Sequence, residues 1–146
     1  MVKSGQRLVR FGPGVRDEVP YSEFGNKASG LATMAQMGIP VPPGFSLSVS
    51  ICEEYYRKGR TLPDDFTTLI SSGIDFLEKA SGSVFGGIRR PLLVSVRSGA
   101  PVSMPGIMDT ILNVGLNRET LRGLIFLSGN PRFAWDTYRR FILEFS

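Results

Sequence analysis

The stretch LLVSVRSGAPVSMPGIMDTILNVGLN, Leu92–Asn117, begins like a buried strand and then changes character. Its first residues are almost all apolar, which is typical of a strand covered on both faces of a sheet. A run rich in Gly, Ser, Pro and Met follows, and TILNV then has the pattern of a second strand. The stretch therefore predicts two strands joined by a loop, with Arg97 and Asp109 near the ends of that loop.

Strands and helices alternate along the part of the chain that precedes this stretch. Alternating apolar residues predict short strands at Arg7–Phe11 and Phe45–Val49, and helices are expected over 24–38 and after Ile51. A third helix is expected between Pro63 and Ala80. Its buried stripe would consist of Phe66, Leu69, Ile70, Gly73, Ile74, Leu77 and Ala80. This order favours an α/β or α+β fold, with a mixed sheet flanked by helices.

The last residues are expected to be helical. RETLRGLIFLSG predicts a helix that ends at Gly129, and Asn130 and Pro131 suit the N-cap and first position of the next helix. The buried face of that helix would hold Ala134, Tyr138, Phe141, Ile142 and Phe145. We therefore expect an α/β part over 1–117 and a helical part that starts at 118 and is interrupted at Ser146.

Composition excludes several classes of function. The chain has no histidine, which excludes a Ser-His-Asp triad, a histidine metal ligand and a phosphohistidine carried by this chain. Its one cysteine, Cys52, cannot form an internal disulfide and is expected to be a packed thiol. No Walker A motif is present. No apolar run approaches the roughly 18–20 residues of a membrane span, so we expect a cytoplasmic protein with no membrane partner.

The formal net charge of +4 comes mainly from scattered arginines, so nucleic acid is not an expected partner. Arg97 is the arginine of most interest, because ligands of open α/β sheets bind beyond the carboxyl ends of strands. It could hold a phosphate with two donors, or it could pair with Asp109. Ser98 and Gly99 are small enough for their backbone N–H groups to approach an anion.

Three further residues are candidates for the site. Lys27 stands near the start of the helix expected over 24–38, where a cation opposes the helix dipole unless an anion binds. Met104 lies in the turn signal SMPG and could line a flat ligand, although methionine is more often a gap filler. Asp109 could hold a partner arginine or a metal, although turn chemistry explains most such residues.

Taken together, these segments resemble the N-terminal nucleotide-binding domain of the pyruvate, phosphate dikinases. The resemblance rests on VSVRSGAPVSMPGIMDTILNVGLN, on GNKASGLATMAQMGIPVPPGFSLSVSICEEYY and on GNPRFAWDTYRRFI, and it runs from about Gly25 onward. The family usually has GGKG where this chain has Gly25-Asn26-Lys27-Ala28. Related phosphoenolpyruvate synthases share only the start of the first segment.

The resemblance implies a partial ATP-grasp fold, with ATP and Mg²⁺ as cofactors. Lys27 and Arg97 match the family's ATP-phosphate-binding residues, which implies a catalytic role, while Ser98, Gly99, Met104 and Asp109 would complete the ATP site. No metal ligand is expected in this chain. The implied partners are the dikinase's phosphohistidine domain and its pyruvate-binding barrel, and self-association is left open. The alternative is a free-standing, non-catalytic nucleotide-binding, regulatory or assembly module.

Overall fold

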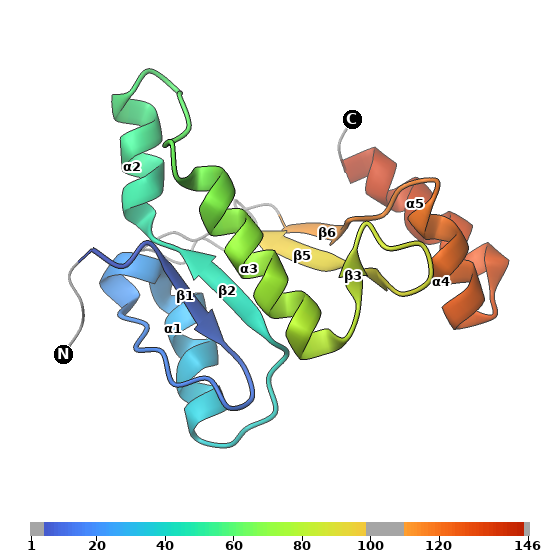
Figure 1. Ribbon diagram of the computed structural model, residues 1–146, viewed down its shortest axis with the longest axis horizontal. Helices are drawn as coiled ribbons and strands as arrows, with labels where there is room; N and C mark the ends of the chain where they lie inside the picture. Colours follow the sequence, from blue (N-terminus) through green and yellow to red (C-terminus); the bar gives the residue numbers. More distant parts are fainter. Residues whose placement is uncertain (1–4, 99–109, 145–146) are drawn as a thin grey trace. The chain divides into compact units, whose positions relative to one another are not determined.

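The computed structural model describes residues 5–98 and 110–144, which form a mixed α/β protein (Figure 1). The chain divides into two compact units, and among the described residues the first covers 5–77 and the second covers 78–98 and 110–144. The described strands form three sheets of two strands each. Among these strands the expected mixed sheet is replaced by separate pairs, of which two are antiparallel and one is parallel.

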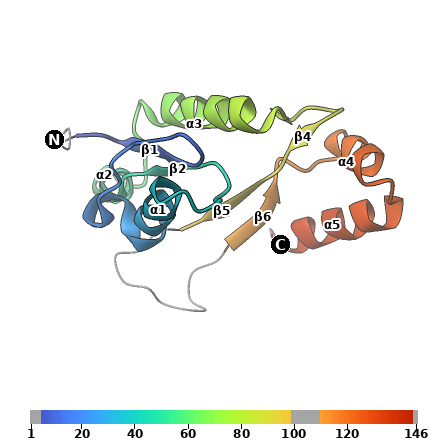
Figure 2. The ribbon, with the colours of Figure 1, turned by 90° about the horizontal axis from the view of Figure 1, so that it is seen from below.

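The first unit is built on an antiparallel strand pair, β1 (Leu8–Phe11) and β2 (Gly44–Leu47). Helix α1 (Tyr21–Gln36) packs on this pair (Figure 2). Val9 of β1 is completely buried and forms a core cluster with Phe24 and Ala28 of α1. These elements agree with the expected strands and helix, because the apolar residues recur at the spacing of each element.

Helix ends in this unit follow the turn chemistry of the sequence. Gly38 has a φ of 80°, and its N–H donates to Ala35, while the Ile39 N–H donates to Met34. This pair of bonds is a Schellman motif, which confirms the expected glycine cap. Helix α2 (Val49–Arg57) begins where the Ser48 hydroxyl accepts the Ser50 N–H at 3.3 Å.

Helix α3 (Phe66–Ser81) contacts the strand pair through side chains of both strands. Arg10 of β1 donates to Ser72 Oγ at 2.7 Å and lies 5.8 Å from the centre of the Phe76 ring. Gly73 faces the Phe45 ring so closely that a Cβ there would come within 2.6 Å of it. Only Gly73 and Leu77 of the expected stripe are buried, while four of its members are half-buried and Ala80 is exposed.

The second unit contains two strand pairs. Strands β3 (Val84–Phe85) and β4 (Pro91–Leu92) are parallel, and β5 (Val94–Arg97) and β6 (Thr110–Val114) are antiparallel. The register between β5 and β6 shifts between Val94 and Val96, and Asn113 takes a φ of 60° there. This geometry is a β-bulge, which asparagine tolerates better than most residues.

Helices α4 (Thr120–Ser128) and α5 (Pro131–Glu144) lie side by side in this unit (Figures 1 and 2). Leu116, Leu121 and Ala134 form its buried cluster, with Tyr138 and Phe141 packed against them. As expected, Gly129 ends α4 in the left-handed region, and Asn130 Oδ1 caps α5 by accepting the Phe133 N–H at 3.0 Å.

Several expectations about burial are wrong. Val96 of β5 is 48% exposed, so this strand is not covered on both faces despite its apolar sequence. On the expected buried face of α5, Ala134 is buried and Tyr138 and Phe141 pack against its cluster, whereas Ile142 is 49% exposed. Cys52 is exposed on α2. The expected burial of Phe145 falls outside the described residues. The expected boundary at 117–118, between an α/β part and a helical part, lies inside the second unit. It stays a prediction about the domains of the whole protein.

Candidate functional site

Lys27 lies on an exposed part of α1 directly after an interruption in that helix. Gly25 has φ 80° and ψ 159° inside α1, so the backbone leaves the helical region at this residue and re-enters it at once. Asn26 and Lys27 are exposed, whereas Gly25 and Ala28 on either side of them are buried. Lys27 forms no ion pair with any other residue in the described ranges. Its ammonium group is therefore directed to the surface at the start of a helical segment.

Arg97 is the last residue of β5 and is paired in register with Thr110 of β6. Both Arg97 and the following Ser98 are exposed. No ion pair joins Arg97 to another residue within 5–98 and 110–144. The side chain thus stands at the carboxyl end of a strand, as the sequence predicts, although the strand itself is only partly buried.

Gly99, Met104 and Asp109 lie outside the described residues, so their roles stay predictions. The pairing of Arg97 with Asp109 is untested for the same reason. Lys27 belongs to the first unit, and Arg97 belongs to the second.

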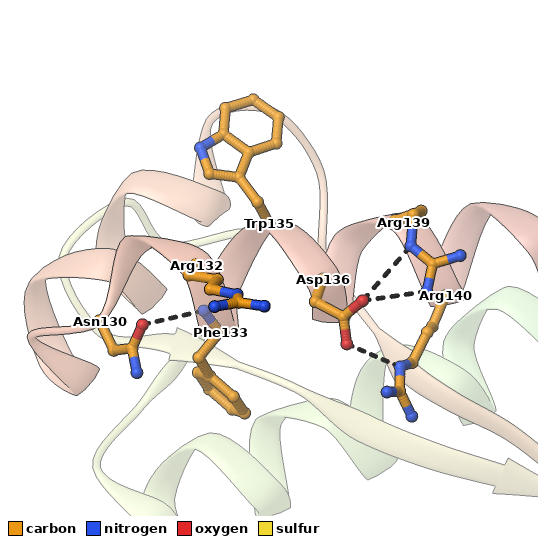
Figure 3. Close-up of a pocket in the computed structure, with 7 residues that line it drawn as sticks. All are labelled: Asn130, Arg132, Phe133, Trp135, Asp136, Arg139 and Arg140. Carbon is orange, nitrogen blue, oxygen red and sulfur yellow. Dashed lines mark hydrogen bonds and ion pairs between the residues drawn. The ribbon is translucent and has the colours of Figure 1, made fainter.

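The second unit carries a pocket that sequence reasoning did not identify as a site. It lies on the surface of α5 and has a volume of about 670 Å³ (Figure 3). Its lining is mainly cationic and aromatic, and comprises Asn130, Arg132, Phe133, Trp135, Asp136, Arg139 and Arg140. All of these residues except Asp136 are exposed. The signal was present in NPRFAWDTYRR, because residues three and four apart share a helix face.

Asp136 organises the arginines of this pocket. Its Oδ1 accepts from Arg139 Nη2 at 3.0 Å, and its Oδ2 accepts from Arg140 Nε at 2.8 Å (Figure 3). The hydrogen bond from Arg139, followed by that from Arg140, lowers the pKa of the Asp136 carboxyl below its ordinary value. One carboxylate therefore aligns two guanidinium groups on α5, and Arg132 brings a third cation to the same surface.

Metal ligands do not gather in the part of the chain that is described. No three side chains of the His, Cys, Asp or Glu types come together there in a group that could hold an ion. Within the same ranges, no helix has both the length and the apolar character that crossing a bilayer requires.

Comparison with known proteins identifies the class to which this mixed α/β chain belongs. No family model matches the chain. Curated relatives do match it. They include the pyruvate, phosphate dikinase of Rhizobium meliloti, which is 50% identical over 119 residues, or 82% of this chain. The pyruvate, phosphate dikinase of Entamoeba histolytica is 46% identical over 140 residues, and pyruvate, phosphate dikinase 2 of Zea mays is 45% identical over 142.

The chain therefore belongs to the pyruvate, phosphate dikinase family. It spans only 13% of the length of the Rhizobium relative and 16% of that of the Entamoeba and Zea relatives. The match thus corresponds to one segment of these proteins, as the resemblance of the sequence motifs predicts.

Proposed function

We propose that this chain is the N-terminal part of the ATP-binding domain of a pyruvate, phosphate dikinase. The whole protein would convert ATP, phosphate and pyruvate into AMP, diphosphate and phosphoenolpyruvate through a phosphohistidine. Because the sequence contains no histidine, the phosphoryl acceptor would belong to another domain. The fold of this part of the protein would be a partial ATP-grasp domain. Residues 1–117 would be its α/β part, and the helical part would start at 118.

The observation that carries the proposal is the state of the two candidate cations. Lys27 is exposed at the start of a helical segment and Arg97 is exposed at the end of a strand, and neither forms an ion pair within the described ranges. A structural arginine or lysine is commonly held by a carboxylate, as Arg7 is held by Glu54 at 2.7 Å. Two unengaged cations are suited to receive an anionic ligand, and arginine can bind a phosphate with two donors.

In the proposed mechanism this chain contributes charge and orientation. Lys27 and Arg97 would neutralise the triphosphate and hold it in line for transfer, which is the main catalytic requirement of phosphoryl transfer. Ser98 and Gly99 would contribute backbone N–H donors, and Met104 and Asp109 would complete the ATP site. Mg²⁺ would be ligated by residues outside this chain. The proposed setting is the cytoplasm, with the remaining dikinase domains as partners and neither nucleic acid nor membrane involved.

A chimeric enzyme tests this proposal against the free-standing module. The chain replaces the matching 140 residues of the Entamoeba histolytica relative, and dikinase activity is measured. A partial domain predicts an active chimera that loses activity when Lys27→Ala or Arg97→Ala is introduced, whereas Lys79→Ala, an exposed lysine on α3, leaves it unchanged. A folded chimera without activity favours the free-standing module instead.

A further inference from the structure

Among the described residues of the first unit, the core contacts of Phe24 and Ala28 do not explain the break in α1 at Gly25. Phe24 and Ala28 are four residues apart, and both are buried against Val9, with exposed fractions of 3% and 7%. Residues at this spacing share one face of an uninterrupted α-helix. A continuous helix could therefore bury both side chains, so the described contacts of these two residues with Val9 do not require the break.

The backbone of Gly25 is nevertheless in a region that other residues do not adopt. With φ 80° and ψ 159°, it lies in a part of conformational space that is essentially restricted to glycine. Backbone outliers of this kind persist where the surroundings hold them, and they concentrate at functional sites. The outlier at Gly25 lies two residues before Lys27.

Both sides of the break are anchored separately. On the N-terminal side, Phe24 is buried against Val9 of β1, and the N–H groups of Glu23 and Phe24 close the first helical turn by donating to the Pro20 carbonyl, each at 3.1 Å. On the C-terminal side, Ala32 is buried and Gln36 Nε2 donates to the Asp17 carbonyl at 3.2 Å. Asp17 in turn accepts the Arg10 N–H of β1 at 2.9 Å. Gly25 thus connects two helical segments that are each held by the rest of the unit, and we call this connection the joint.

We propose that Gly25 is a positioning residue for Lys27, because the joint sets where the lysine stands at the start of the second helical segment. A helix that ran straight through residue 25 would keep Phe24 and Ala28 in the core and would move Lys27 relative to them. This inference rests on the proposed function, in which Lys27 binds the triphosphate. It adds that the site depends on a backbone conformation and on the charge together.

Calorimetric titration of the 146-residue chain with Mg-ATP tests the inference through a double-mutant cycle. Lys27→Ala and Gly25→Ala should each weaken binding by roughly tenfold, the loss of one charge-assisted hydrogen bond. The double variant should lose little more than either single variant, because Gly25 acts through Lys27. The matched control is Gly30→Ala, an exposed position of α1 where a Cβ would meet no atom within 4 Å, and it should bind as the wild type does.

Two results would overturn the inference. One is wild-type affinity in Gly25→Ala. The other is a set of losses that multiply in the double variant, which indicates a structural role independent of Lys27. If Gly25→Ala does not fold, the exchange of two exposed residues, Asn26→Lys with Lys27→Asn, takes its place. That exchange should weaken binding as Lys27→Ala does, and unchanged affinity contradicts the inference.

Backbone carbon chemical shifts separate this inference from the proposed function. If the wild-type chain takes up no Mg-ATP, the ATP site is incomplete in this chain alone, and the shifts decide the inference while the chimera tests the proposed function. A break at Gly25 that disappears in Gly25→Ala, with Phe24 and Ala28 still in the core, supports the joint. Helical shifts that run through Gly25 in the wild type overturn it.

Discussion

Asn117 and Thr120 cap each other at the start of α4. The Asn117 N–H donates to Thr120 Oγ1 at 2.8 Å, and the Thr120 N–H donates back to Asn117 Oδ1 at 2.9 Å. The Thr120 hydroxyl also donates to the Gly115 carbonyl at 3.0 Å, and the residue is completely buried. The end of the motif LNVGLN therefore has a structural role, which is to join β6 to α4.

Thr120→Val should destabilise the chain by about 1–3 kcal/mol, because it leaves the Asn117 N–H and the Gly115 carbonyl without their partner. Urea unfolding followed by circular dichroism measures the change. Thr67→Val, at an exposed position of α3, is the matched control and should change stability by no more than about 0.5 kcal/mol. Equal effects of the two substitutions would show that the reciprocal cap adds no stability.

Close packing around Gly123 supports a second prediction about stability. A Cβ on this residue of α4 would overlap the carbonyl oxygen of Ile88 and approach Pro91 Cδ to 2.8 Å. Gly123→Ala should therefore cost about 1–3 kcal/mol through overpacking. Gly30→Ala, in open space on α1, should instead stabilise by about 0.5–1 kcal/mol. Thermal unfolding of both variants checks the opposite signs, and a neutral Gly123→Ala contradicts the packing.

Glu54 links stability to pH in the first unit. Its carboxylate bonds Lys58 Nζ at 2.9 Å and Arg7 Nη2 at 2.7 Å, while Arg7 Nη1 also lies 3.1 Å from Asp65. The hydrogen bond from Lys58, assisted by the charges of Lys58 and Arg7, lowers the pKa of Glu54 below its ordinary value. A lowered carboxyl pKa contributes stability that is fully present above the unfolded value of about 4.3 and is lost as the pH falls through the folded value.

Glu54→Gln should therefore flatten the loss of stability between about pH 5 and pH 3. Lys58 acts at alkaline pH, because its hydrogen bond to Glu54 raises the pKa of its ammonium group. The stability that Lys58 contributes is lost only as the pH rises through this raised pKa. Urea midpoints measured across the acid range provide the test. Glu53→Gln is the control, since Glu53 is exposed and has no ion pair among the described residues. If stability falls equally with decreasing pH in Glu54→Gln and in the wild type, Glu54 does not link stability to pH.

Local patterns in the sequence predict the elements of this fold well. Turn chemistry predicts the helix caps at Gly38, Gly129 and Asn130. The spacing of apolar residues predicts the strands around Val9 and Phe45. What surrounds an element does not follow from those patterns. Val96 and Ile142 are apolar and exposed, because hydrophobicity favours burial without specifying which partner covers the residue.

The candidate site shows the same division. The sequence places Arg97 at the end of a strand and Lys27 near the start of a helical segment, and the structure agrees for both. It does not predict the break at Gly25, because glycine within a helical pattern is compatible with several conformations. Nor does it identify the pocket on α5, which depends on how Asp136 aligns Arg139 and Arg140. Gly99, Met104 and Asp109 remain predictions from the sequence.

In the proposed site, Lys27 and Arg97 contact the phosphates of ATP. The affinity of the 146-residue chain for Mg-ATP and for AMP, measured in the wild type, Lys27→Ala and Arg97→Ala, tests both contacts. We expect each substitution to weaken Mg-ATP binding by roughly tenfold or more and to leave AMP binding nearly unchanged, because each removes a charged donor to the triphosphate. Mg-ATP affinities that equal the wild-type value in both variants would contradict the proposed contacts.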